Sequence, residues 1–140
     1  ISINTHLGSN FIIGGQISGQ EHALMMVYPV GNYIRASEIK PFFQLGETKY
    51  GKPILDRLIR NETSLGDAAR CALVSFDSTM KSDLTVGPPI DLVVYKKDSI
   101  QISLEEHLQF KTPFFSDLSS KWSEGLRNLF KELPKFDWEK

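Results

Sequence analysis

Residues 64–95 read SLGDAARCALVSFDSTMKSDLTVGPPIDLVVY, and this stretch decides the fold. Ser64 is a preferred N-cap residue, and Asp67 favours the positive start of a helix. Apolar residues then recur at helical spacing, at Leu65, Ala69, Ala72, Leu73, Phe76 and Met80. The Gly-Pro-Pro sequence at 87–89 ends the helix, and the apolar run at 90–95 predicts a buried strand. A long helix leading directly into such a strand indicates a mixed fold.

The residues before this stretch predict a small antiparallel meander. Short apolar or aromatic runs bounded by turn residues occur at 11–17, 24–28, 33–36 and 42–45. Each has the length and the flanking glycines or prolines of a strand. Pro53 suits the first turn of a helix, where a missing N–H costs nothing. We therefore expect four strands and then a short helix ahead of the long one.

The residues after it predict a hairpin and a last helix. Residues 99–104 are the expected partner of the strand at 90–95. An apolar face at helical spacing over residues 119–133 predicts a helix that Pro134 stops. Phe136 and Trp138 leave two large aromatic side chains in a short tail, and we expect them to anchor a neighbouring molecule. The whole chain of 140 residues is predicted to be one α+β domain.

Composition excludes several functional classes. A net charge of −1 with interspersed signs gives no footprint for nucleic acid or an anionic membrane. No apolar run reaches the ~20 residues that a transmembrane helix needs. The histidines, His6, His22 and His107, lack the spacing of metal ligands, so we expect neither a metal nor a cofactor. Cys71, the single cysteine, lies on the apolar stripe and is predicted to be a small buried hydrophobe.

The first candidate functional stretch is GETKYGKP, residues 46–53, where a strand end feeds a helix start. A glycine allows another backbone to approach closely, and a helix amino terminus offers free N–H groups. Glu47 and Thr48 are candidates to present a carboxylate and a hydroxyl to a site. The alternative is that Thr48 only caps the helix.

The second candidate is Asp83, at the end of the long helix. A carboxylate there faces the negative pole of the helix dipole, so it needs a compensating cation, ammonium or backbone donor. The alternative is an ordinary solvated aspartate. Within the same helix, Asp77 is expected to pair with Lys81 on the solvent side, and Ser78 and Thr79 are expected to face water.

At these two places the sequence resembles a known family. The segments FFQLGETKYGKPILDR (42–57), DAARCALVSFDSTM (67–80) and GPPIDLVVY (87–95) are similar to Anbu, the ancestral beta subunit, a bacterial proteasome-type peptidase. FIIGGQ (11–16) and the last helix fit as well, so the resemblance covers nearly the whole chain.

The resemblance implies an Ntn-hydrolase fold, a four-layer αββα sandwich of which this chain is the carboxy-terminal portion. In that fold an amino-terminal Thr attacks the peptide carbonyl and its own α-amino group is the base. The Thr, the Lys and the first Asp of the family have no counterpart here, since Ile1 carries no nucleophilic atom. We expect the subunit to be active when complete and the chain alone to be inactive.

The resemblance also assigns supporting roles. Asp83 is implied to hold the reactive amine or hydroxyl. The supporting Ser of the family falls on Val86, so the adjacent Thr85 is the candidate for that task. Glu47 or Thr48 is implied to take the role of a Ser in the turn before the preceding helix.

Three functional hypotheses follow. The leading one is a cytoplasmic threonine peptidase subunit that acts on peptides or proteins and associates with itself into rings or open spirals. It requires the amino-terminal half of the same subunit as a partner. The second is a non-catalytic assembly subunit of the same fold. The third is a small α+β binding module unrelated to proteolysis.

Overall fold

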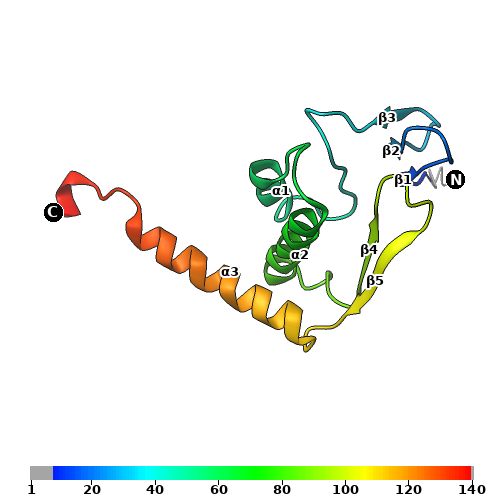
Figure 1. The fold of residues 1–140 in the computed structure, drawn as a ribbon. Coiled ribbons are helices and arrows are strands. Elements are labelled where there is room, and N and C mark those ends of the chain that lie inside the picture. Colours follow the sequence, from blue (N-terminus) through cyan, green and yellow to red (C-terminus); the bar gives the residue numbers. More distant parts are fainter. Residues whose placement is uncertain (1–7, 140) are drawn as a thin grey trace, which may run out of the picture.

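The computed structural model describes residues 8–139, which form two antiparallel sheets on one side of a pair of helices and a long last helix that runs away from them (Figure 1). Strands β1 (Phe11–Gly15), β2 (Ala23–Val27) and β3 (Tyr33–Arg35) form the first sheet in that order. Helices α1 (Lys52–Leu58) and α2 (Leu65–Ser82) follow, and β4 (Ile90–Tyr95) pairs with β5 (Ile102–Leu108). Helix α3 (Pro113–Glu132) and a 3₁₀ turn (Asp137–Glu139) end the chain. The mixed α+β class is therefore confirmed.

Helix α2 forms as its sequence predicts. Ser64 is the N-cap residue, and its Oγ accepts the N–H of Asp67 at 3.1 Å. Arg70 pairs with Asp67 on the exposed side. Leu73, only 1% exposed, is the centre of a core cluster with Ile90, Leu108 and Phe115. A second cluster joins Leu55 and Ile59 to Cys71, so the cysteine is buried as expected.

Three predicted elements differ from the structure. The strand expected at 42–45 is irregular, because no described strand lies beside it; Phe42 packs instead on the cluster around Leu55. The partner of β4 runs to Leu108 and begins at Ile102, because Asp98 and Ile100 both take positive φ and lengthen the turn. Helix α3 begins at Pro113, six residues before the predicted start, with proline in its first turn.

The pairing of Asp77 with Lys81 is confirmed, but the expectation that Asp77 and Thr79 face water is wrong. Asp77 and Thr79 are 5% and 4% exposed, so neither faces water. Asp77 does bind Lys81 (2.6 Å), but it also accepts a hydrogen bond from Ser119 of α3 (2.6 Å). Lys81 reaches Ser123 of α3 at 2.9 Å. The carboxylate is buried because α3 covers it and supplies donors, which satisfies the charge.

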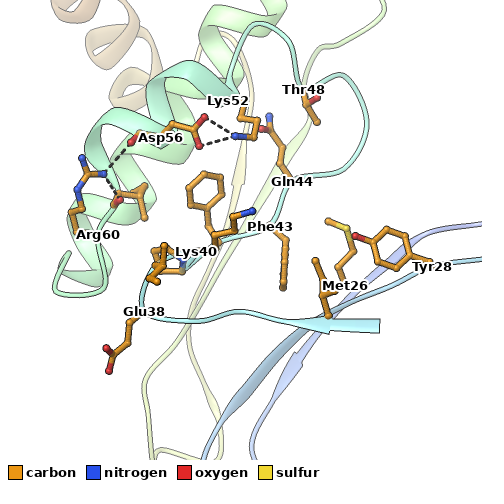
Figure 2. Close-up of a pocket in the computed structure, with 15 residues that line it drawn as sticks. Met26, Tyr28, Glu38, Lys40, Phe43, Gln44, Thr48, Lys52, Asp56 and Arg60 are labelled. Atoms are coloured by element: carbon orange, nitrogen blue, oxygen red, sulfur yellow. Dashed lines mark hydrogen bonds and ion pairs between the residues drawn. The ribbon is translucent and has the colours of Figure 1, made fainter. Parts of the chain in front are cut away.

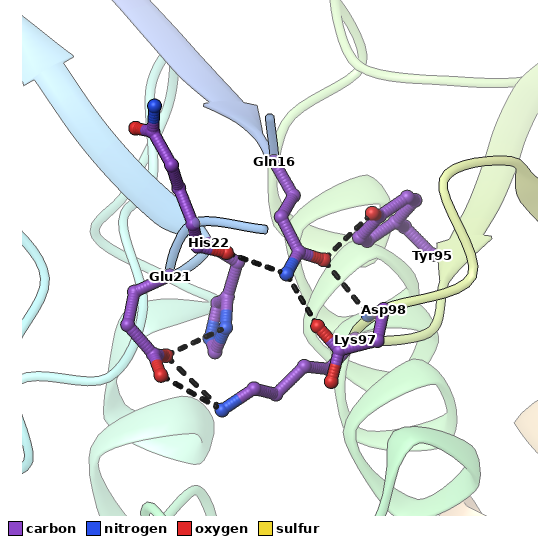
Figure 3. A network of polar contacts seen from close by, with 7 residues as sticks. Gln16, Glu21, His22, Tyr95, Lys97 and Asp98 are labelled. Carbon is purple, nitrogen blue, oxygen red and sulfur yellow. Dashed lines mark hydrogen bonds and ion pairs between the residues drawn. The ribbon is translucent and has the colours of Figure 1, made fainter. Parts of the chain in front are cut away.

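A polar network joins the two sheets at their turns (Figure 3). The Gln16 amide donates to Asp98 Oδ1 (2.6 Å) and to the Gln20 carbonyl (2.8 Å). Its oxygen accepts from the Tyr95 hydroxyl and the Asp98 N–H, both at 2.8 Å. One side chain thus makes four hydrogen bonds, three of them to the β4–β5 hairpin.

A Glu at position 16 keeps the shape of this amide but loses its two donors and adds charge beside Asp98. We expect Gln16→Glu to lower the free energy of unfolding by roughly 1–2 kcal/mol at neutral pH. The loss should shrink as the pH falls below about 4, where the new carboxyl regains a proton. Urea unfolding at both pH values measures this. Gln20→Glu adds the same charge nearby, and an equal loss there would refute the role of the Gln16 amide.

The start of α1 lies against α2 at Gly51. A Cβ on Gly51 would lie 2.1 Å from Ser75 Oγ and 2.9 Å from the Ser75 carbonyl oxygen. We expect Gly51→Ala to destabilise the protein by about 1–3 kcal/mol through overpacking, measured by urea unfolding.

Gly66, in the first turn of α2, is the matched control because an added Cβ there meets nothing within 4 Å. Gly66→Ala should be neutral or stabilise by up to about 1 kcal/mol, since alanine favours helix. Equal effects at the two glycines would show that the α1–α2 contact tolerates a side chain.

Candidate functional site

A cavity of about 480 Å³ lies between α2 and the turn that precedes α1. One wall is the turn, including Gly46 and Glu47, and the opposite wall is α2 with the loop after it, including Thr79 and Val86. Ile12 of β1 also lines it. Gly46 and Glu47 of the first candidate stretch therefore line one cavity with Val86 of the loop after α2, whereas Asp83 and Thr85 are not among its lining residues.

Asp83 caps the carboxyl end of α2, and its backbone N–H donates to the Thr79 carbonyl at 2.8 Å. Its side-chain Oδ1 accepts the Thr85 N–H at 2.8 Å and the Thr85 hydroxyl at 2.7 Å. These bonds from Thr85, with the charge of Lys49 adding to them, lower the pKa of Asp83. The carboxylate thus has the compensating donors that its place at the helix end requires.

The facing turn is shaped by Gly46, whose φ of +84° is a conformation that other residues rarely adopt. Glu47 follows, with its side chain 24% exposed, and its Oε1 accepts the N–H of Lys49 at 2.9 Å. The Lys49 ammonium lies 3.8 Å from Glu47 Oε2. Because Lys49 also acts on the pKa of Asp83, the carboxylates of Glu47 and Asp83 share one neighbouring cation. Lys49 was not identified from the sequence. The pattern that could have pointed to it is a cation two residues after the candidate acid Glu47.

Thr48 lines a different cavity, of about 560 Å³, between α1 and the β2–β3 side of the molecule (Figure 2). The N-cap of α1 is Gly51, and no side chain caps it, so the alternative of Thr48 as a capping residue is wrong. In this cavity Lys52 binds both oxygens of Asp56, at 2.8 and 2.6 Å. Gln44 presents a buried oxygen that has no hydrogen-bond partner among the described residues.

Helix α2 contributes two buried hydroxyls to the first cavity. Thr79 Oγ1 donates to the Ser75 carbonyl at 2.9 Å, and both residues are 4% exposed. Phe76, between them, is 46% exposed although it belongs to the predicted apolar stripe. The cavity therefore has an aromatic wall beside two buried hydroxyl groups, of which that of Thr79 is hydrogen-bonded to the backbone.

The remaining titratable groups lie elsewhere. Burial raises the pKa of the Cys71 thiol, which keeps it protonated and unreactive. His22 and His107 lie beside Glu21 (3.9 Å) and Asp91 (2.7 Å), and His6 lies outside the described residues. Within residues 8–139 no three metal-ligating side chains gather at one point, and no helix is long and apolar enough to cross a membrane.

Comparison with known proteins places these features in a family. No protein-family model matches the chain, and no curated protein matches it. Solved structures do. Anbu from Hyphomicrobium sp. strain MC1 is 49% identical, with a TM-score of 0.88 over 91% of this chain and 55% of that one. Anbu from Yersinia bercovieri is 42% identical, with a TM-score of 0.88 over the same shares of the two chains.

A third match carries information on assembly. The structure titled as the helical assembly of the Anbu complex from Pseudomonas aeruginosa is 46% identical, with a TM-score of 0.87 over 95% of this chain. The chain spans about half the length of these relatives, 55% in each case. These are proteasome-like subunits, and identity above 40% at such TM-scores leaves no ambiguity of fold. Over the region that it spans, the chain belongs to the Anbu family.

The two bonds from Thr85 generate a prediction about Asp83. Thr85→Val removes the hydroxyl donor and keeps the backbone one, so the pKa of Asp83 should rise while staying below its ordinary value. Because that pKa is depressed in the folded state, the linked stability is present above the unfolded pKa and is lost as pH falls through the folded one. In Thr85→Val this loss should be smaller and should be complete at a higher pH. NMR titration of the carboxyl carbon tests it, and Thr85→Ser should match the parent; an unchanged pKa in Thr85→Val would contradict the assignment.

Proposed function

We propose that this chain is the carboxy-terminal portion of a proteasome-type threonine peptidase subunit, and that it supports an attacking Thr supplied by an amino-terminal portion. The single observation that carries the proposal is the shared cavity between the Gly46–Glu47 turn and the end of α2. Membership of the Anbu family supports it, since these relatives are about twice as long as the region matched here.

In this proposal Asp83 accepts a hydrogen bond from the amine or hydroxyl of the attacking Thr. Its low pKa keeps it ionised, and Thr85 fixes the direction of the carboxylate through two donors. A preorganised negative charge stabilises the ammonium that forms when the α-amino group takes the hydroxyl proton. Thr85 acts in place of the family's Ser, because Val86 offers no hydroxyl.

Glu47 and Thr48 take different parts. Glu47 lines the cavity that Val86 also lines, and it holds Lys49, whose charge also acts on Asp83. Thr48 faces the neighbouring cavity and positions the turn through its carbonyl, which accepts the N–H of Lys52 at 3.0 Å. Of the two, Glu47 is our choice for the role of the Ser in the family's turn.

Several apolar side chains are exposed among the described residues, and their exposure supports a larger single domain. Phe11 and Ile13 of β1 are 58% and 50% exposed, and Phe76 faces the cavity. A sheet needs one face covered, so we propose that the missing strands of an αββα sandwich pack here. Residues 1–140 are then part of one Ntn-hydrolase domain rather than a domain of their own.

The proposal extends to setting and assembly. A single, buried, unreactive cysteine suits the reducing cytoplasm. The Pseudomonas aeruginosa relative forms a helical assembly, and we propose self-association for this protein also. The second candidate is a non-catalytic assembly subunit, which would have the same structure but no turnover. It is favoured by Val86, because a valine stands where the family has a supporting Ser.

Labelling and turnover of the full-length protein test the proposal. The parent should cleave members of a peptide panel, and an epoxyketone should add covalently to its amino-terminal Thr, detected by mass spectrometry. Asp83→Asn should reduce the labelling rate by about ten- to a hundredfold while the protein stays folded at the assay temperature. Asp91→Asn, an exposed aspartate of β4, is the matched control and should label like the parent.

Two outcomes would contradict this. A parent protein that assembles but neither cleaves nor labels is the assembly subunit. Normal labelling in Asp83→Asn would remove Asp83 from the site.

A further inference from the structure

The cavity beside α1 that Thr48 lines, which we call the side cavity, has no ligand in the proposed function. Its volume of about 560 Å³ lies within the range of ~300–1,000 Å³ that small-ligand sites occupy. Apolar side chains from β2, β3 and the segment that leads to α1 form its floor, among them Met26, Ile34, Phe42 and Phe43. Phe43 and Gln44 also line the candidate-site cavity, so the two cavities share a wall. A molecule in the side cavity would therefore lie next to the candidate site.

The charges around the side cavity leave it positive. Of the two acidic residues that line it, Asp56 is bound by Lys52 through both oxygens, at 2.8 and 2.6 Å, and Glu38 points away from the cavity (Figure 2). Arg60 Nη1 donates to two backbone carbonyls at 3.0 and 2.8 Å, which holds the guanidinium in place. Its other nitrogens, and the ammonium of Lys40, have no partner within residues 8–139. Two cations therefore remain for a carboxylate from outside.

One polar atom that lines the side cavity also lacks a partner. Gln44 Oε1 is buried and accepts no hydrogen bond from any residue that the structure describes. A buried acceptor in this state is costly and is rarely left unpaired in a folded protein. A ligand that carries an N–H group would satisfy it.

We propose that the side cavity binds the carboxyl-terminal residue of a peptide that ends in an apolar side chain. The peptide carboxylate binds Lys40 and Arg60, its last backbone N–H donates to Gln44 Oε1, and its side chain packs on the apolar floor. A terminal carboxylate, an N–H and an apolar group occur together in one such residue, as their three kinds of partner occur in one cavity. Hydrolysis of a peptide bond makes new ends of this kind, so the inference deepens the proposed function and rests on it for the source of the ligand.

Calorimetric titration of the full-length protein with N-acetyl-alanyl-leucine tests the proposal. The free acid should bind, and its carboxamide, which lacks the charge, should bind at least about tenfold more weakly. Octanoate has a carboxylate and an apolar chain but no N–H, so it should also bind more weakly than the peptide acid. A carboxamide that binds as well as the acid, or octanoate that binds more tightly, would overturn the assignment to a peptide end.

A lysine variant tests the carboxylate contact. Lys40→Met keeps the length of the side chain and removes its charge, so it should weaken binding of the acid at least about tenfold and leave binding of the carboxamide unchanged. Lys111→Met is the matched control, because Lys111 is an exposed lysine in the turn between β5 and α3. The control should bind like the parent. Equal losses in the two variants, or no loss in Lys40→Met, would refute the contact.

A glutamine variant separates a ligand site from an internal contact. Gln44→Met removes the unpaired acceptor with little change in volume. It should weaken binding of the peptide acid several-fold and leave the urea midpoint of the ligand-free full-length protein unchanged or higher, since no hydrogen bond is lost. A large drop in that midpoint would show that the amino-terminal portion already pairs with Gln44, and it would overturn the proposal.

Failure of the proposed function would look different. A full-length protein that binds the acid through Lys40 but does not react with the epoxyketone has the peptide site without peptidase activity, and its ligand is a peptide made by another enzyme. A protein that reacts with the epoxyketone but does not bind N-acetyl-alanyl-leucine keeps the peptidase and refutes the peptide site.

Discussion

The close contact between Gly51 and helix α2 positions the two walls of the candidate cavity relative to each other. At this point the start of α1 approaches Ser75 so closely that no side chain fits between them. Gly46 and Glu47 lie five and four residues before Gly51, and Asp83 caps the end of α2 about two turns after Ser75. Fixing one helix start against the middle of another therefore fixes both walls of the cavity. The bonds from Thr85 then orient the Asp83 carboxylate, and together with the charge of Lys49 they lower its pKa.

Many of these elements could be predicted from the sequence, because they depend on residues that lie close together along the chain. The N-cap, the acidic first turn and the apolar spacing of α2 lie within about twenty residues, and each follows from helix physics alone. The start of α1 at its proline and the turn signals of the β1–β2–β3 meander are equally local. Asp83 was singled out because a carboxylate at the negative end of a helix needs partners, and the structure supplies them from Thr85 and Lys49.

The rest depends on contacts that a single sequence does not reveal. Asp77 has the polarity of a solvent-facing residue, and only the arrival of Ser119, forty-two residues later, makes its burial favourable. Residues 42–45 have strand composition but no described neighbour to pair with, so composition alone misleads. Phe76 shows the reverse: it lies on the apolar stripe, yet among the described residues it is open to solvent. That Glu47 and Thr48 line different cavities is also a matter of tertiary geometry, since neighbouring residues in a turn share every local signal.

The two surfaces left exposed have different causes, and α2 links them. Ile12 of β1 and Phe76 of α2 line the candidate cavity, so whatever covers them also closes it. The exposed second half of α3 lies at the other end of the molecule, and the Asp77–Lys81 pair holds the first half through Ser119 and Ser123. Burying the Asp77 carboxylate is costly unless its oxygens are paired, and Lys81 and the Ser119 hydroxyl pair them. Asp77 of α2 therefore helps to hold α3 in place, while Asp83 caps the end of the same helix.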